Sequence, residues 1–207
     1  MATKYAAVIS AIFLTGCSYQ TTPLESPAYN VVSSYGEKVK GKWLLYVDAA
    51  PLDRPIKTAG IACSAYKFPI TMANVFTTST RATIGNLVEA VELVSSPANA
   101  EQVAANGARG LIVVRGEELR PRLDVQQGFW SASMDATVVI IASVSVDGRS
   151  GRLLGSSVEG QGRANAEAGF ACSGGAKSLE DAAGQSMTDT LRKIGESISN
   201  SERVRAG

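Results

Sequence analysis

The sequence predicts an α+β fold: a mixed or antiparallel sheet with a long C-terminal hairpin and helices packed on one face, forming a two-layer sandwich. Apolar and polar side chains alternate over residues 136–146, which is the period of a half-buried strand. Apolar residues recur every three or four positions over 178–199, which is the period of an amphipathic helix. Because strand and helix patterns also alternate earlier in the chain, we expect one sheet covered by helices.

Residues 42–48 form the first predicted strand, which Pro51 ends. Prolines and glycine make 51–69 an irregular connection, with a short strand expected at 61–63. We then expect a helix over 70–87, on which one face collects residues three or four apart: Met72, Phe76, Ser79, Thr83 and Leu87.

A strand is expected over 88–94, and a short helix over 97–106 that stops at Asn106-Gly107. A buried strand follows at 110–115. The long alternating strand 136–146 then turns at Asp147-Gly148 into a partner strand over 153–161.

The last predicted helix runs over 178–199, and Ser178 with Asp181 resembles a capping box at its start. Its apolar stripe consists of Leu179, Ala182, Ala183, Met187, Leu191, Ile194 and Ile198. This stripe is suited to cover the apolar face of the long strand.

The start of the chain has the layout of a secretory signal peptide. Lys4 precedes the apolar run 6–14, which is too short to span a bilayer as a permanent helix, and small residues lead into Cys17. Leu14-Thr15-Gly16-Cys17 resembles the lipobox of bacterial lipoproteins. The resemblance implies cleavage after Gly16, a diacylglyceryl thioether on Cys17 and acylation of the new amino terminus, and several acyl chains give stable anchoring.

Two other interpretations of this segment remain open: a plain signal peptide with an incidental cysteine, and a buried apolar segment of a cytosolic fold. In the lipoprotein family, an aspartate after the lipidated cysteine favours retention in the inner membrane. Ser18 at that position therefore implies the outer membrane, with the domain facing the periplasm.

We expect four segments along the chain: a signal peptide over 1–16, the lipidated cysteine with a polar spacer over 17–40, one α+β domain over 41–200, and a tail over 201–207. The chain is 45% hydrophobic and 19% charged, with a formal net charge of +1, which is typical of a globular domain. Nucleic acid is not an expected partner, because its binding requires clustered basic residues.

The sequence contains no histidine. This excludes Ser-His-Asp and Cys-His nucleophile arrangements and the usual histidine-based zinc and iron sites. We expect no enzyme activity, no metal and no cofactor. Two cysteines remain besides Cys17, and in an oxidising compartment Cys63 and Cys172 are expected to form a disulfide. Two free thiols, or a bond to another chain, are the alternatives.

Three segments invite a binding-site interpretation, and each has a simpler one. Residues 171–178 resemble a phosphate-binding loop but lack its two obligatory glycines, so a glycine-rich lead into a helix is expected. Gly160-x-Gly162 lacks the third glycine of a dinucleotide motif. Glu117, Glu118 and Asp124 lie among arginines, which favours a solvated charge cluster over a cation site.

Phe129 and Trp130 are adjacent aromatics in a polar, glycine-containing segment. They either pack under the sheet or contact a partner subunit or the membrane interface, because aromatic residues are typical anchors of contact surfaces. We take them as the candidate contact residues.

A lipobox, a polar spacer, and an α+β domain with a long hairpin and a closing amphipathic helix together resemble the broad class of YajG-like and PelC-like outer-membrane lipoproteins. The resemblance implies a structural, assembly or accessory subunit in envelope biogenesis or export, which acts through envelope protein partners or self-association. The alternative is a periplasmic lipoprotein that binds a glycan, lipid or peptide in a cleft between sheet and helices.

Overall fold

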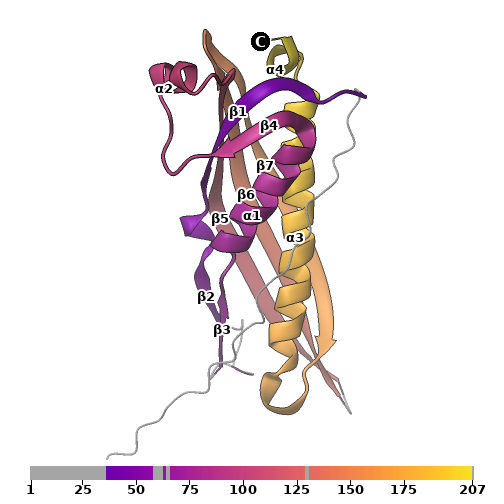
Figure 1. Cartoon of the computed structure of the whole chain (residues 1–207). Helices are drawn as coiled ribbons and strands as arrows, with labels where there is room; N and C mark the ends of the chain where they lie inside the picture. The colour runs from indigo at the N-terminus through magenta and orange to yellow at the C-terminus, as the bar shows by residue number, and fades with distance from the viewer. Residues whose placement is uncertain (1–35, 58–62, 64–65, 129–130, 207) are drawn as a thin grey trace, which may run out of the picture.

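A computed structural model of the chain describes residues 36–57, 63, 66–128 and 131–206. Five strands form one mixed sheet in the order β4-β1-β5-β6-β7 (Figure 1). Their bounds are β1 Val39–Asp48, β4 Val88–Leu93, β5 Gly110–Gln127, β6 Ala132–Gly148 and β7 Gly151–Glu167. Strand β1 runs parallel to both of its neighbours, and β5, β6 and β7 form an antiparallel meander. The predicted mixed sheet with a long hairpin is confirmed.

Two helices, α1 (Ala73–Leu87) and α3 (Gly174–Ser199), lie side by side on one face of this sheet (Figure 1). They cover the large hydrophobic core, in which the side chains of Phe76 and Leu191 are buried against β1, β5 and β6. The expected two-layer sandwich is therefore present along most of the sheet.

The short helix α2 (Ala100–Ala105) packs on the opposite face of the sheet. We expected helices on one face only, so the position of α2 differs from the prediction. Its Val103 joins a second core cluster with Leu44 of β1 and Leu111 of β5. Residues 43–45 and 111–114 are apolar without alternation, because both faces of β1 and β5 are covered at this end of the sheet.

The alternation over 136–146 is confirmed. The inward side chains Ala136, Val138, Ile140, Ala142, Val144 and Val146 are at most 2% exposed. Their neighbours on the outward face are only half-buried. The strand is longer than the pattern, because β6 pairs with β5 on one side and β7 on the other along almost its whole length.

Strand β5 extends twelve residues beyond the predicted 110–115, to Gln127, and contains Pro121. Strand β1 ends opposite Arg115, so the rest of β5 pairs with β6 alone. The carbonyl of Leu119 accepts a hydrogen bond from Arg54 and therefore points away from β6. Because residues two apart in a strand point to the same side, the nitrogen of Pro121 also faces away from β6, where no ladder bond is lost.

The irregular connection over 51–69 contains a small antiparallel pair, β2 (Arg54–Lys57) and β3 (Lys67–Ile70). Of the short strand expected at 61–63, only Cys63 lies within the described residues, where it belongs to a turn. Helix α1 begins at Ala73, later than expected. The Asp53 carboxylate accepts the N–H groups of Met72 and Ala73 at 2.6 and 2.8 Å, so a distant residue supplies the cap.

Helix α3 begins at Gly174, four residues before the predicted start. Ser178 is not its cap, because it is fully buried inside the first turns and its hydroxyl donates to the carbonyl of Gly175. The expected tail also contains structure. Helix α4 (Glu202–Ala206) buries Val204, and Arg205 donates a hydrogen bond to the carbonyl of Glu37.

Candidate functional site

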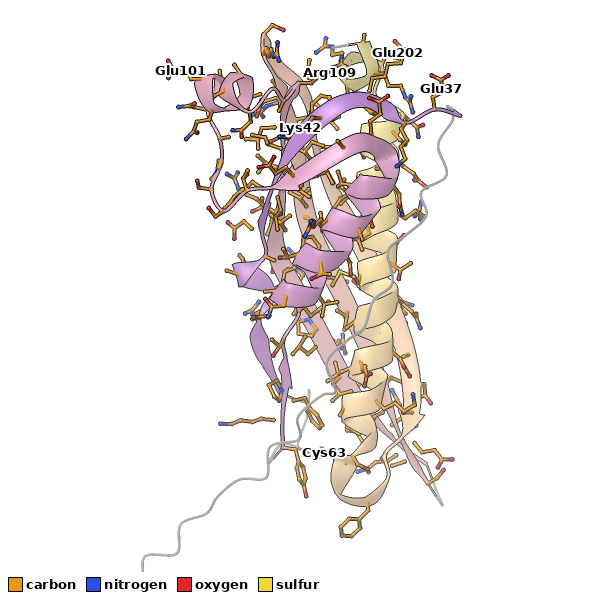
Figure 2. The ribbon with its side chains drawn as sticks, viewed as in Figure 1. Glu37, Lys42, Cys63, Glu101, Arg109 and Glu202 are labelled. Carbon is orange, nitrogen blue, oxygen red and sulfur yellow. A yellow bond between two sulfur atoms is a disulfide. The ribbon has the colours of Figure 1, made fainter. Side chains whose placement is uncertain are left out.

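The Cys63–Cys172 disulfide lies at one end of the molecule (Figure 2). Cys63 follows β2, and Cys172 ends the short 3-10 helix η2 (Phe170–Cys172) just before α3. The predicted pairing is confirmed. Both sulfur-bearing residues are half-buried and pack against the large core, so the bond joins the β2–β3 pair to the start of α3. Its role in the described structure is that of a cross-link.

Phe170 lies two residues before this disulfide and is 93% exposed. The preceding strand β7 ends beside the start of β6, where the N–H of Ala168 donates to the carbonyl of Ala132. A phenylalanine so exposed is the kind of side chain that anchors contact surfaces. Sequence reasoning did not single it out, because an isolated Phe between Gly169 and Ala171 shows no pattern.

The candidate contact residues Phe129 and Trp130 lie outside the described residues, as does Cys17. The residues that flank the aromatic pair are described. Gln127 pairs with Ala132 across the β5–β6 hairpin, and the N–H of Gly128 donates to the carbonyl of Ser131 at 2.8 Å. Gly128 and Ser131 therefore lie at the same end of the sheet as Phe170 and the disulfide. We call this end, defined by Gly128, Ser131, Phe170 and Cys172, the disulfide end.

Four charged residues of β5 form two ion pairs. Arg120 contacts Glu118, and Arg122 contacts Asp124, each at 2.7 Å. The hydrogen bond from Arg120 lowers the pKa of the Glu118 carboxyl and raises the pKa of the Arg120 guanidinium. Within the described ranges, no group of three or more His, Cys, Asp or Glu residues is arranged to hold a metal ion.

The two glycine-containing segments pack against neighbouring elements. A Cβ on Gly162 would lie 1.9 Å from the carbonyl oxygen of Ala182, and one on Gly160 would lie 2.0 Å from the hydroxyl of Thr190. These glycines let α3 lie directly on β7. A Cβ on Gly175 would meet Phe68 at 2.9 Å, so this glycine is required by core packing at the start of α3.

Side chains of α3 also bind the free edge of β7. Gln185, Asp189 and Lys193 form one row along the helix, four residues apart. Their side chains bond in turn to the N–H of Arg163, the N–H of Gln161 and the carbonyl of Glu159. These backbone groups are therefore not available to a further strand.

The described residues line at least two surface cavities. One of about 240 Å³ is lined by Arg109, Gly148, Arg149, Ser150 and Leu153, at the end of the molecule opposite the disulfide, as the positions of Arg109 and Cys63 in Figure 2 show. The other, of about 330 Å³, lies between β4 and α2 and is lined by Leu44, Leu93, Val94, Ser95, Ser96, Ala98, Gln102 and Asn106. Neither is the cleft between sheet and helices that a ligand-binding lipoprotein was expected to have.

The space between the sheet and α3 is filled by side chains. Val138 and Ile140 of β6 face Met187 and Leu191 of α3, and each of the four is at most 1% exposed. Among the described helices, none is long and apolar enough to cross a membrane.

No family model matches the chain, and no curated protein matches its sequence. Solved structures do resemble it. The crystal structure of a Xanthomonas campestris protein described by the family model DUF330 aligns over 86% of this chain and 93% of that protein, with a TM-score of 0.51 and 11% identity. At this identity the likeness shows a shared fold and nothing more.

Two further structures align at lower scores. A minor lipoprotein of Acinetobacter baumannii covers 73% of this chain and 87% of its own, with a TM-score of 0.36 and 11% identity. The PelC dodecamer of Paraburkholderia phytofirmans covers 85% and 98%, with a TM-score of 0.32 and 13% identity. Scores this low carry no argument about the present chain, and its place among YajG-like or PelC-like lipoproteins stays a prediction.

Proposed function

We propose that this chain is a lipid-anchored protein on the periplasmic side of the bacterial outer membrane that acts as a structural or assembly subunit through protein contacts. The observation that carries the proposal is the segment Leu14-Thr15-Gly16-Cys17 behind the apolar run 6–14. It supplies the signal for export and the sulfur for the anchor.

The disulfide supports an exported location. Such bonds form and persist in oxidising compartments and are rare in the cytosol. The bond joins Cys63 to Cys172, and the remaining cysteine of the sequence is Cys17 at the lipobox. Export to an oxidising compartment thus explains the disulfide between two of the cysteines, and the lipid anchor explains the third.

The contact role rests on the disulfide end. Phe170 is 93% exposed there, at the same end of the sheet as Gly128 and Ser131, which flank Phe129 and Trp130 in the sequence. Phe and Trp at a protein surface are favourable anchors, because their apolar area gains free energy when a partner removes it from water. We therefore place the partner surface at the disulfide end and expect no enzyme activity of the domain.

The proposal is tested by affinity capture of the acylated chain from gently solubilised envelopes. We expect a stoichiometric protein partner, or a second copy of the chain, that is lost in both Trp130→Ala and Phe170→Ala while the melting temperature is retained. The matched control is Tyr46→Ala, a half-buried aromatic in β1, away from the disulfide end. Capture of the same partner by both aromatic variants would contradict the contact surface, and a purified chain that is a monomer in every extract would contradict assembly.

A further inference from the structure

The cavity lined by Arg109 and Arg149 lies at the end of the sheet where the β6–β7 hairpin turns. We propose that it is a binding site for one phosphate group, either free or on a lipid head group. Its lining contains two guanidinium groups and a serine but no carboxylate, so its electrostatic character favours an anion.

Arg149 is positioned by the backbone. Its Nε and Nη2 atoms both donate to the carbonyl of Ala108, at 3.2 and 3.0 Å. No carboxylate among the described residues forms an ion pair with it. Two of its five N–H donors are thus bound to a neutral carbonyl group, which does not balance the positive charge of the guanidinium. A guanidinium held in this way is preorganised for an oxyanion, because its fork matches the geometry of phosphate.

Arg109 is seated by packing as well as by hydrogen bonding. Its guanidinium lies 5.8 Å from the centre of the Trp43 ring, and its Nη1 donates to the carbonyl of Lys40 at 3.1 Å. Gly41 adopts a φ of +84°, and a Cβ there would lie 2.4 Å from Cδ of Arg109. The backbone therefore leaves room for this side chain, which fixes the second cationic wall of the cavity.

The size of the cavity limits the ligand. Its volume of about 240 Å³ is smaller than the roughly 300–1,000 Å³ of pockets that enclose a whole small molecule. One anionic group fits, and any remainder of the ligand lies outside. Leu153 forms an apolar part of the wall, and Ser150 supplies a hydroxyl donor.

The site is tested on the purified full chain by calorimetric titration with two probes, inorganic phosphate and glycerophosphoglycerol, the water-soluble head group of phosphatidylglycerol. We expect saturable binding that falls about tenfold or more in Arg149→Ala, since hydrogen bonds to charged groups contribute strongly. Arg149→Lys keeps the charge without the fork, and an intermediate affinity is expected. The tighter probe identifies the source of the phosphate group.

The matched control is Arg122→Ala, which removes an exposed arginine from the middle of the same sheet. We expect it to retain the affinity of the unaltered chain. If Arg149→Ala does not fold, Arg149→Lys alone provides the test. Weaker binding than in the unaltered chain supports the site, and unchanged binding contradicts it. Absence of saturable binding of either probe, or equal weakening by Arg122→Ala, would overturn the proposal.

Discussion

The backbone N–H of Gln161 in β7 donates to the carboxylate of Asp189 in α3 at 3.2 Å. Asp189 also forms ion pairs with Arg192 at 2.6 Å and with Lys193 at 2.8 Å. One carboxylate thus satisfies an edge backbone group and holds two cations of its own helix. It links α3 to the free edge of the sheet, where an unpaired strand would invite pairing with another chain.

Removal of this carboxylate should destabilise the fold and expose the edge. We expect Asp189→Ala to lower the free energy of unfolding by about 1–2 kcal/mol, which is less than the roughly 1.5–3 kcal/mol of a buried hydrogen bond to a charged group because the Asp189 side chain is 26% exposed. Chemical denaturation measures this loss. Asp124→Ala, which breaks an exposed pair on β5, is the control and should change stability by less than about 0.5 kcal/mol. Equal losses in the two variants would show that the edge contact contributes nothing.

The contribution of Asp189 should depend on pH. Burial raises the pKa of Asp189, but hydrogen bonds from Lys193 and Arg192 outweigh that effect, so its pKa in the folded chain lies below the ordinary 3.8. A depressed pKa stabilises the folded state above the unfolded pKa, and this stabilisation is lost as the pH falls through the folded value. The stability difference between the unaltered chain and Asp189→Ala should therefore be constant near neutrality and shrink below pH 3.8. A stability difference that grows as the pH falls would contradict the lowered pKa of Asp189 in the folded chain.

Gly162 is required by the contact between β7 and α3. We expect Gly162→Ala to destabilise the chain by about 2 kcal/mol or more, because the new methyl group would overlap the carbonyl of Ala182 and the helix must move. Gly155→Ala in the same strand is the matched control, since the nearest atom to its Cβ is the end of Arg152, 3.9 Å away. Thermal unfolding of both variants distinguishes them, and similar melting temperatures would refute close packing at Gly162.

The disulfide should stabilise the domain mainly by constraining the unfolded chain. Its two cysteines are 109 residues apart, and the chain-entropy model gives about 4–5 kcal/mol for a loop of this size. We expect Cys63→Ser with Cys172→Ser to lose about 2–5 kcal/mol, the range for native disulfides. A reducing agent should lower the stability of the unaltered chain equally and leave the double variant unchanged. An effect of reduction on the double variant would place the sensitivity elsewhere.

Two phenylalanines near the same end should behave oppositely. Phe68 of β3 is fully buried, and Phe68→Ala should lose about 3–5 kcal/mol of stability. Phe170 is 93% exposed, and Phe170→Ala should stay within about 0.5 kcal/mol of the unaltered chain. Denaturant unfolding of both variants provides the measurement. A large loss in Phe170→Ala would mean that this side chain is part of the core and not of a contact surface.

Sequence patterns predicted the parts of the fold that repeat a simple period. The alternation over 136–146 and the apolar stripe of α3 both describe one buried face, and the structure places these two faces against each other. The disulfide followed from the compartment that the first residues indicate. These features depend on local patterns or on a count of cysteines.

Other features depend on tertiary neighbours and were missed. The extension of β5 through Pro121 requires that β1 stop at Asp48, and the start of α1 requires Asp53 from another segment. The role of Gly162 depends on the position of α3, and the exposure of Phe170 depends on where β7 ends. Likewise, the Arg109–Arg149 cavity joins residues forty positions apart, which no motif connects.

The proposed role in the envelope depends most on the fatty modification of Cys17. Metabolic labelling with radioactive palmitate, followed by isolation of the full chain and its Cys17→Ala variant, tests it directly. We expect label on the unaltered chain alone, together with a mature product that begins at Cys17. An unlabelled chain that retains residues 1–16 would contradict the envelope anchor, and with it the proposed function.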